Sequence, residues 1–180
     1  MSAGDLYESW RALGALVLSR HDFKKTGLTV SAVFRPAAIV AAARELYAAG
    51  YFLENLSALE AKEGLLVTWH FDSAGKPGRV ALRALAGGDN SLPSLHGVYQ
   101  GAEWHEREAA DFFGLRFTGN PNPVPLLLPH DFAGPPPLLK EDGALAALAD
   151  LKIFGEAEAL DPAWRAIVDP ASAAKEGGAA

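Results

Sequence analysis

The residues best suited to chemistry gather in one short stretch of the sequence. Residues 103–108 read Glu-Trp-His-Glu-Arg-Glu and Asp111 follows closely, which makes this the densest charged cluster in the chain. On a helix, Glu103, Arg107 and Asp111 would stand four residues apart, so the arginine can pair with a carboxylate on either side. We expect Arg107 to be paired with Glu103 or Asp111 and partly shielded from water.

A catalytic role for this cluster finds little support elsewhere in the sequence. His105 and Glu106 resemble the start of a His-Glu-x-x-His zinc helix, but Ala109 stands where the second histidine belongs. Acid–base catalysis by Glu106, Glu108 or Asp111 in a freestanding enzyme stays open as an alternative, although no second constellation accompanies these carboxylates. The chain has no cysteine, which excludes thiolate ligands and cysteine nucleophiles.

The helix that would carry this cluster is not simply amphipathic. Trp104, Glu108, Phe112 and Leu115 fall on one face, so charged and aromatic side chains mix around the helix. This pattern indicates a helix that is covered on several sides with its charges paired. An ordinary surface helix with incidental ion pairs is the alternative.

The remaining elements follow from hydrophobic periodicity and from helix-ending residues. Pro36 suits a first helical turn and Gly50 the residue after a last turn. The predicted elements are helices over 6–19 and 36–49, a later helix over the charged cluster, and strands over 28–34, 53–59, 65–71 and 79–85. Their order predicts an α+β two-layer domain with a mixed β-sheet covered by helices.

Proline dominates a segment after the charged cluster. Seven of the 12 prolines lie in residues 121–137. Proline fixes φ and lacks an N–H, so we expect residues 120–140 to form an extended arm laid across a surface. The expected organisation is a single domain over 1–140 that includes this arm, a partly helical extension over 141–170 and a disordered tail over 171–180.

Composition and charge exclude several classes of protein. The 180 residues are 49% hydrophobic and 21% charged, as in one soluble globular domain. The net charge of −6 argues against nucleic acid as a partner. No apolar run approaches the roughly 20 residues of a membrane-spanning helix, and no secretory signal is readable at the start.

The charged cluster and its surroundings resemble the signature of the 30 kDa subunit family of respiratory complex I, the NADH dehydrogenase 30 kDa subunit. The resemblance covers roughly residues 28–140, and the signature within it begins with Pro93, Ser94 and Ala102. The positions that fit the signature and serve as candidate site residues are Trp104, Glu106, Arg107, Glu108, Asp111, Phe113, Gly114, Phe117, Gly119, Pro121, Leu128, Pro129, Gly134 and Lys140.

The resemblance implies a non-catalytic structural subunit, with no catalytic, cofactor-binding or metal-binding residues of its own. Such a subunit packs in the peripheral arm of an NADH–quinone oxidoreductase, where electron transfer from NADH to quinone is coupled to ion translocation. The implied partners are a large quinone-site or hydrogenase-like subunit and iron–sulfur subunits, with FMN or nickel–iron elsewhere in the assembly. The implied location is peripheral, on the cytoplasmic face of the cell membrane, with membrane contact only through the complex.

One segment departs from the family pattern. Where complex I members carry His-Pro-Asp-Leu-Arg-Arg, residues 120–125 read Asn-Pro-Asn-Pro-Val-Pro, and Leu139 replaces a usual arginine. Without these arginines the arm cannot make the same bidentate contacts with carboxylates. The alternative is therefore that the chain is the equivalent subunit of a membrane-bound energy-converting [NiFe] hydrogenase.

Overall fold

The computed structural model describes residues 3–75, 78–140 and 144–168. The helices are α1 (Ala3–Ala12), α2 (Phe23–Thr26), α3 (Pro36–Ala48), α4 (Ala102–Phe113) and α5 (Pro162–Val168), with a 3-10 helix η1 (Leu148–Leu151). The strands are β1 (Val17–Arg20), β2 (Leu28–Val33), β3 (Phe52–Ala61), β4 (Gly64–Asp72), β5 (Arg79–Leu85), β6 (Ser91–Pro93), β7 (Arg116–Thr118) and β8 (Glu156–Ala159). No helix in these ranges is long and apolar enough to cross a membrane.

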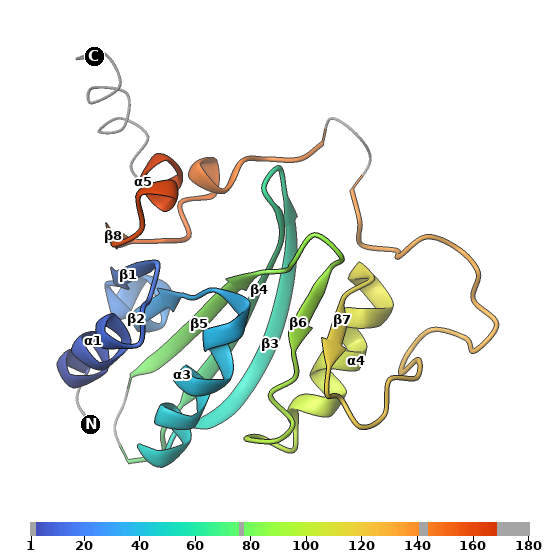
Figure 1. The fold of residues 1–180 in the computed structure, drawn as a ribbon, viewed down its shortest axis with the longest axis horizontal. Coiled ribbons are helices and arrows are strands. Elements are labelled where there is room, and N and C mark those ends of the chain that lie inside the picture. Colours follow the sequence, from blue (N-terminus) through green and yellow to red (C-terminus); the bar gives the residue numbers. More distant parts are fainter. Residues whose placement is uncertain (1–2, 76–77, 141–143, 169–180) are drawn as a thin grey trace.

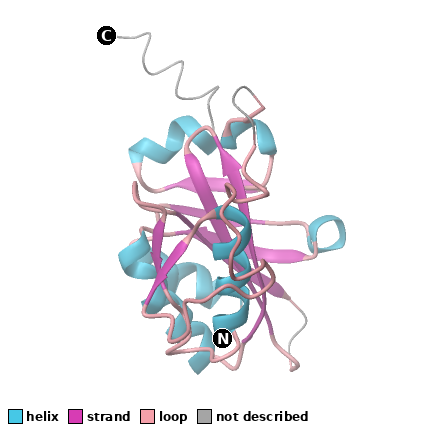
Figure 2. Cartoon of the chain, turned by 90° about the vertical axis from the view of Figure 1, so that its right-hand side faces the viewer, coloured by secondary structure: helices cyan, strands magenta, loops and turns pink. Residues whose placement is uncertain are grey.

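Six strands form one mixed sheet in the order β3-β4-β5-β2-β1-β8 (Figure 1). β2 and β5 run parallel, and the other neighbours in this sheet run antiparallel. The short strands β6 and β7 pair in parallel beside it. Figure 2 shows the strands crossing the middle of the molecule, with helices at their ends and flanks. The predicted α+β fold with a mixed sheet and covering helices is confirmed.

One face of the large sheet supplies the main hydrophobic core. Val67, Trp69 and Phe71 alternate along β4 toward this face, as the two-residue period of a strand requires. Helices α1, α3 and α4 pack on the same core, and Trp10 of α1 is fully buried there. The strands predicted over 65–71 and 79–85 are thus confirmed.

The C-terminal segment covers the other face. Val17 and Val33 on this face pack with Leu148, Phe154 and Trp164 in a second buried cluster. β8 pairs antiparallel with β1, so the sheet continues beyond residue 140, the expected end of the domain. The tail expected over 171–180 lies outside the described residues.

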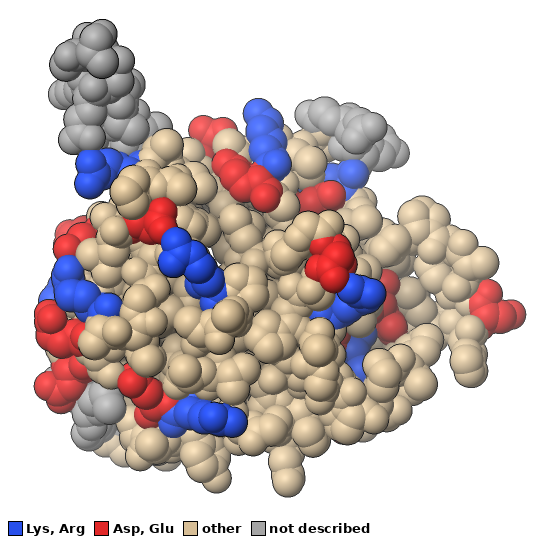
Figure 3. All heavy atoms as spheres, viewed as in Figure 1, with Lys and Arg blue, Asp and Glu red and all other residues tan. Residues whose placement is uncertain are grey.

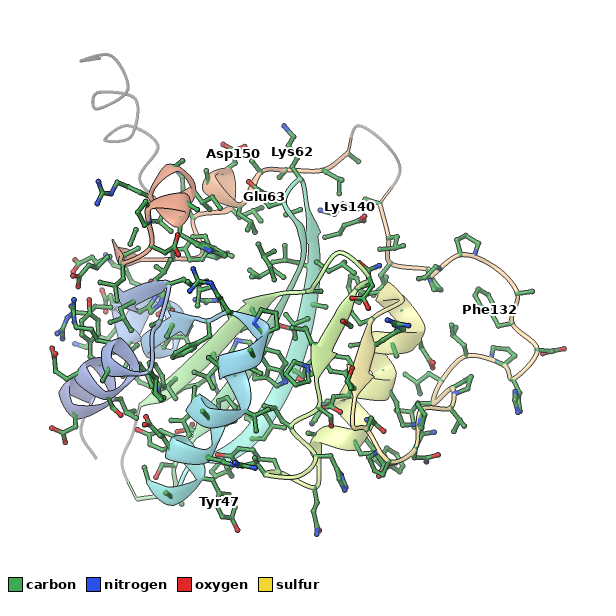
Figure 4. The ribbon with its side chains drawn as sticks, in the orientation of Figure 1. Tyr47, Lys62, Glu63, Phe132, Lys140 and Asp150 are labelled. Carbon is green, nitrogen blue, oxygen red and sulfur yellow. The ribbon has the colours of Figure 1, made fainter. Side chains whose placement is uncertain are left out.

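The turn between β3 and β4 is hydrogen-bonded to the C-terminal segment that covers the second face. The amide of Lys62 donates to the carbonyl of Ala146 at 3.1 Å, and the amide of Leu148 donates to Glu63 Oε2 at 3.0 Å. Figure 4 labels Lys62 and Glu63 at this turn, beside the segment that follows residue 143. These bonds fix the path by which the C-terminal segment reaches β1.

The helix predicted over 6–19 was wrong at its C-terminal end. α1 stops at Ala12, and residues 17–20 form β1 instead. Gly14 adopts a φ of +81°, which ends the helix in a conformation that other residues rarely take. Val17 and Leu18 then face opposite sides of the sheet and are both fully buried. Burial on two faces, which a surface helix cannot provide, selects the strand.

Candidate functional site

Helix α4 positions the candidate residues. It ends at Phe113 and is followed by Gly114, whose φ of +67° gives the left-handed conformation that is common after a last helical turn. Ala102, Glu106 and Ala109 form its buried side, while Trp104 is 63% exposed. The expected mixture of charged and aromatic groups around the helix therefore has a structural basis, because a carboxylate lies on the buried side and an indole faces outward.

Glu106 is a fully buried carboxylate whose oxygens both have donors. Its Oε1 accepts from the amide of Leu95 at 2.7 Å, and its Oε2 accepts from Ser94 Oγ at 2.6 Å and from Asn120 Nδ2 at 2.8 Å. Burial raises the pKa of this carboxyl, and the three hydrogen bonds oppose part of that rise. Glu106 thus ties α4 to the segment after β6 and to the start of the arm.

Arg107, the next residue of α4, contacts the arm. Its guanidinium pairs with Glu103 at 3.3 Å, which confirms the expected ion pair, and the Arg107 side chain is only 12% exposed. It also donates to the carbonyls of Val124 at 2.9 Å and Pro125 at 3.0 Å. Arg107 therefore binds backbone carbonyls of the arm as well as a carboxylate.

Asp111 binds the next three residues of the arm through their amides. Its Oδ2 accepts from the amides of Leu126, Leu127 and Leu128 at 2.9, 2.8 and 3.1 Å. Partial burial opposes ionisation, but the hydrogen bonds from Leu127, Leu128 and Leu126 and the charge of Arg107 lower the pKa of Asp111. Arg107 and Asp111 are one helical turn apart. Arg107 thus binds backbone carbonyls of the arm, and Asp111 binds the backbone amides that follow them. We call this pair and its arm contacts the α4 clasp.

The arm is held at its far end as well. The amide of Leu138 donates to the carbonyl of Phe112 at 3.0 Å, and the amide of Lys140 donates to Glu60 Oε2 at 2.6 Å. Between the attachment of Leu128 to Asp111 and that of Leu138 to Phe112, the chain forms a projecting loop, on which Figure 4 labels Phe132. Residues 120–140 contain no helix or strand and lie against α4 at both ends. The segment is not extended throughout, because the amide of Phe132 donates to the carbonyl of Pro129 at 3.0 Å and that of Leu139 to the carbonyl of Pro136 at 3.2 Å, which are turns.

The other candidate residues fall into three groups. Phe117 is buried in the main core, whereas Glu108 is exposed. Gly114 and Gly134 sit under close neighbours, since a Cβ at either would lie 3.0 Å from Pro136 Cγ or 2.8 Å from Phe132 Cζ respectively. The remaining candidates are half-buried or exposed: Phe113, Gly119, Pro121, Leu128, Pro129 and Lys140. The signature therefore combines packing positions, arm contacts and surface positions.

Two contributors were not among the candidate site residues. Ser94 and Asn120 both donate to Glu106, Ser94 from the start of the signature and Asn120 from the segment that departs from it. Asn120 stands where the family pattern has histidine, and its amide supplies an N–H donor at that place. The signal available in the sequence was that Asn120, like the histidine it replaces, has a side-chain N–H that can donate to a carboxylate.

A cleft with a volume of about 550 Å³ lies between α4, β7 and the arm. Glu106, Arg107 and Asp111 line it, but Glu108 does not, so the three candidate carboxylates do not converge on one point. Within residues 3–75, 78–140 and 144–168, no three His, Asp or Glu side chains gather closely enough to hold a metal ion. The geometry favours fastening of the arm over acid–base chemistry, because Glu106 and Asp111 already accept several protein hydrogen bonds.

Comparison with known proteins places these features in a family context. Residues 32–144 match the family described as "Respiratory-chain NADH dehydrogenase, 30 Kd subunit". NAD(P)H-quinone oxidoreductase subunit J of Synechococcus sp. (strain WH7803) is 51% identical over 49 residues, which are 27% of this chain and 27% of that protein. A subunit of the NADH-quinone oxidoreductase of Azorhizobium caulinodans is 33% identical over 110 residues, which are 61% of this chain and 48% of that protein. The matches thus span less than half the length of these relatives.

A solved structure supports the fold independently. The trypsin-resistant fragment (1-134) of Nqo5, in its P63 form, superimposes with a TM-score of 0.57 at 22% sequence identity. The match covers 68% of this chain and 99% of the fragment. At this identity the likeness bears on the architecture of the domain alone.

Proposed function

Because the chain belongs to the family of the 30 kDa subunit of respiratory-chain NADH dehydrogenases, we propose that it is a non-catalytic subunit of the peripheral arm of a complex I-like NADH–quinone oxidoreductase. In this role it packs against the large quinone-site subunit and contacts the membrane only through the complex, on the cytoplasmic face. The observation that carries the proposal is the α4 clasp, since the charged groups of the signature bind the chain's own arm.

The clasp leaves an apolar surface for a partner. Trp104, Leu127, Phe132 and Leu138 are 63%, 60%, 43% and 52% exposed. In residues 120–139 Asp131 is the single Asp, Glu, Lys or Arg, and Figure 3 shows the outer part of the arm as almost uncharged. Apolar surface with so few charges is typical of the centre of protein–protein interfaces.

The fastened ends of the arm also reduce what docking would cost. Prolines restrict the backbone of the projecting loop, and Phe132 lies against Gly134, where a Cβ would be 2.8 Å from its ring. A loop that is already ordered loses less conformational entropy on binding than a flexible one. The loop around Phe132 is therefore suited to enter an apolar depression on a partner.

The redox groups of the assembly belong, in this proposal, to other subunits. Iron–sulfur clusters use thiolate ligands in most proteins, and this sequence has no cysteine. We assign FMN and the clusters to the partner subunits. The purified chain should accordingly show no flavin or iron–sulfur absorbance and should not oxidise NADH, whereas stoichiometric bound flavin or metal would contradict this assignment.

A second assembly is favoured by one segment of the sequence. Residues 120–125 lack the aspartate and the two arginines of the complex I pattern, so Val124 and Pro125 bring no side-chain charge to this segment. A changed contact segment fits a different large subunit, such as that of an energy-converting [NiFe] hydrogenase. The subunits that purify with the chain distinguish the two assemblies.

The test is affinity purification of the tagged chain from membranes of its own organism. A large subunit and iron–sulfur subunits should be recovered in amounts equal to the chain, with NADH–quinone activity for the complex I-like assembly. The variant Phe132→Asp should lower the recovered complex at least about tenfold, because an unpaired carboxylate would enter an apolar contact. Phe23→Asp, at an aromatic that is 47% exposed on α2, is the matched control. A chain recovered alone, or equal recovery with both variants, would contradict the proposal.

A further inference from the structure

A second surface feature lies away from the arm. The C-terminal end of α3, the start of β3 and the loop before α4 enclose an open groove with a volume of about 790 Å³. Its lining includes Arg44, Tyr47, Phe52, His96 and Tyr99. Figure 4 labels Tyr47 at the outer end of α3, far from the loop that carries Phe132. We call this feature the Tyr47 groove.

Two large aromatic side chains at the groove are exposed. Tyr47 is 62% exposed and Phe52 is 50% exposed. Tyr47 stacks edge-to-face on Tyr99 with ring centroids 5.5 Å apart, and Tyr99 contacts Phe71 of the core at 5.3 Å. Tyr99 is itself fixed, because its hydroxyl donates to the carbonyl of Tyr51 at 3.1 Å. The aromatic wall is therefore ordered before any partner binds.

The charge of the groove is opposite to that of the whole chain. The net charge of the chain is −6, yet none of the described residues that line the groove is an Asp or Glu. Arg44 is exposed, and in the described part of the chain its guanidinium pairs with no carboxylate. An exposed arginine beside aromatic rings can take a carboxylate at its guanidinium while apolar groups contact the rings.

The position of the groove favours an extended peptide as its occupant. Phe52 and Leu53, which begin β3, line one side, and β3 is an edge strand of the large sheet. Edge strands and the depressions beside them are recurring sites at which extended segments bind. Gly97 and Gly101 line the groove as well, and a Cβ at either glycine would meet nothing within 4 Å.

We propose that the Tyr47 groove binds an extended acidic segment of another protein, with a carboxylate paired to Arg44 and apolar side chains against Tyr47 and Phe52. This surface is separate from the α4 clasp and the arm. It would give the chain a second partner contact, independent of the one described above.

The test is site-specific photo-crosslinking of the full chain in its own organism. A photoreactive amino acid replaces Tyr47 in one strain, Leu127 of the arm in a second and Lys24 of α2 in a third. The Tyr47 position should crosslink to a peptide that contains Asp or Glu beside apolar residues, and the Lys24 position should give no such product. Arg44→Glu should lower the Tyr47 crosslink at least about tenfold without changing the Leu127 crosslink, because like charges repel across an interface.

Steric blocking gives a second variant that keeps the charge of Arg44. Gly97→Leu adds a side chain beside the groove at a position with open space around its Cβ, and it should also weaken the Tyr47 crosslink. Thermal unfolding of both variants should match the wild type, since they alter only surface groups.

The outcomes separate this proposal from the role of the arm. A crosslink at Leu127 with none at Tyr47 would overturn the groove proposal and leave the arm contact standing. A Tyr47 crosslink to a second copy of this chain, or to a segment rich in Lys and Arg, would also overturn it. A Tyr47 crosslink to an acidic segment with none at Leu127 would support the groove and contradict the proposed role of the arm.

Discussion

Glu106 shows how a charged residue can serve the fold of this protein. It is fully buried, yet each carboxylate oxygen accepts at least one hydrogen bond from a neighbouring segment. A buried carboxylate without such donors would cost several kcal/mol or take up a proton. The side chain therefore joins α4 to residues 94–95 before it and to Asn120 after it.

Replacing Glu106 by alanine should destabilise the protein by about 2–5 kcal/mol, because the buried amide of Leu95 loses its acceptor and a cavity forms. Glu108→Ala, at an exposed position on the same helix, should change stability by less than about 0.5 kcal/mol. Urea unfolding of both variants measures the difference. Equal stability of the two variants would show that the hydrogen bonds of Glu106 add nothing to the fold.

Arg83 is a buried cation on the face of the large sheet that the C-terminal segment covers, and the histidines near it make stability depend on pH. Arg83 is 5% exposed, its Nη1 donates to Ser31 Oγ at 2.6 Å, and burial lowers its pKa to about 10. His21 contacts the same hydroxyl at 2.8 Å, and burial, with a smaller effect of the Arg83 charge, lowers the pKa of His21 to about 4. Burial and Arg83 also lower the pKa of His70, although Glu54 opposes this.

A lowered histidine pKa means that the unfolded chain binds protons more readily than the folded chain. Stability should therefore be complete above about pH 6.5 and decline as the pH falls toward 4. Because His21 is partly exposed, we expect it to contribute at most about 1 kcal/mol of loss between about pH 7.5 and 5.5. The loss should be smaller in His21→Gln, when urea unfolding is compared at the two pH values. An identical loss in both proteins would exclude His21 as a source of the pH dependence.

At the scale of elements, α4 and the arm act as one unit. The Asp111 carboxylate binds three consecutive amides of the arm, and hydrogen bonds to a charged acceptor are stronger than those to a neutral one.

Asp111→Asn should loosen residues 126–128 and cost about 1–2 kcal/mol, since a neutral amide oxygen accepts more weakly than a carboxylate. Proteolysis of the arm in the isolated chain should become faster. Glu108→Gln, which makes the same chemical change at an exposed position of α4, should leave the cutting rate unaltered. If the two variants are cut equally fast, the clasp does not hold the arm.

Gly155 lies where the C-terminal segment packs closely against the end of β1. Gly155 has a φ of +61°, and a Cβ there would lie 2.7 Å from the carbonyl oxygen of Arg20 and 2.7 Å from His21 Nδ1. Gly155→Ala should therefore cost about 1–3 kcal/mol and displace β8 from β1. Gly88→Ala, at a position with open space, is the control for thermal unfolding. Unchanged melting of Gly155→Ala would mean that β8 is not firmly docked.

These elements also show what a sequence can predict. The alternation of apolar and polar residues predicted β4, and Pro36 and Gly50 predicted the ends of α3. In both elements the local sequence pattern agrees with which side chains are buried. The sequence predicts helix at β1 because Val17 continues the helical spacing of Trp10 and Leu13, and only pairing with β2 and β8 reveals the strand. The pairing of Arg107 with Glu103 followed from helical spacing, whereas the amides bound by Asp111 depend on the path of the arm, which spacing cannot specify.

At the scale of the whole molecule, the described residues form one large sheet with both faces covered, a two-stranded sheet beside it and an arm fastened to α4 (Figure 1). The family match covers residues 32–144, so β8 and α5 extend the fold beyond the matched region. We propose that the arm of this domain is an interface for a partner protein of the assembly.

Limited chymotrypsin digestion of the isolated chain and of the purified complex tests that claim most directly. Phe132 is 43% exposed on the projecting loop, so chymotrypsin should reach the bond after it in the isolated chain at a measurable rate. In the complex the same cleavage should slow at least about tenfold as a partner covers the loop, while cleavage at Phe23 of α2 provides the internal reference. Equal cutting between residues 120 and 140 in both states would contradict the claim and leave the arm as a connecting segment.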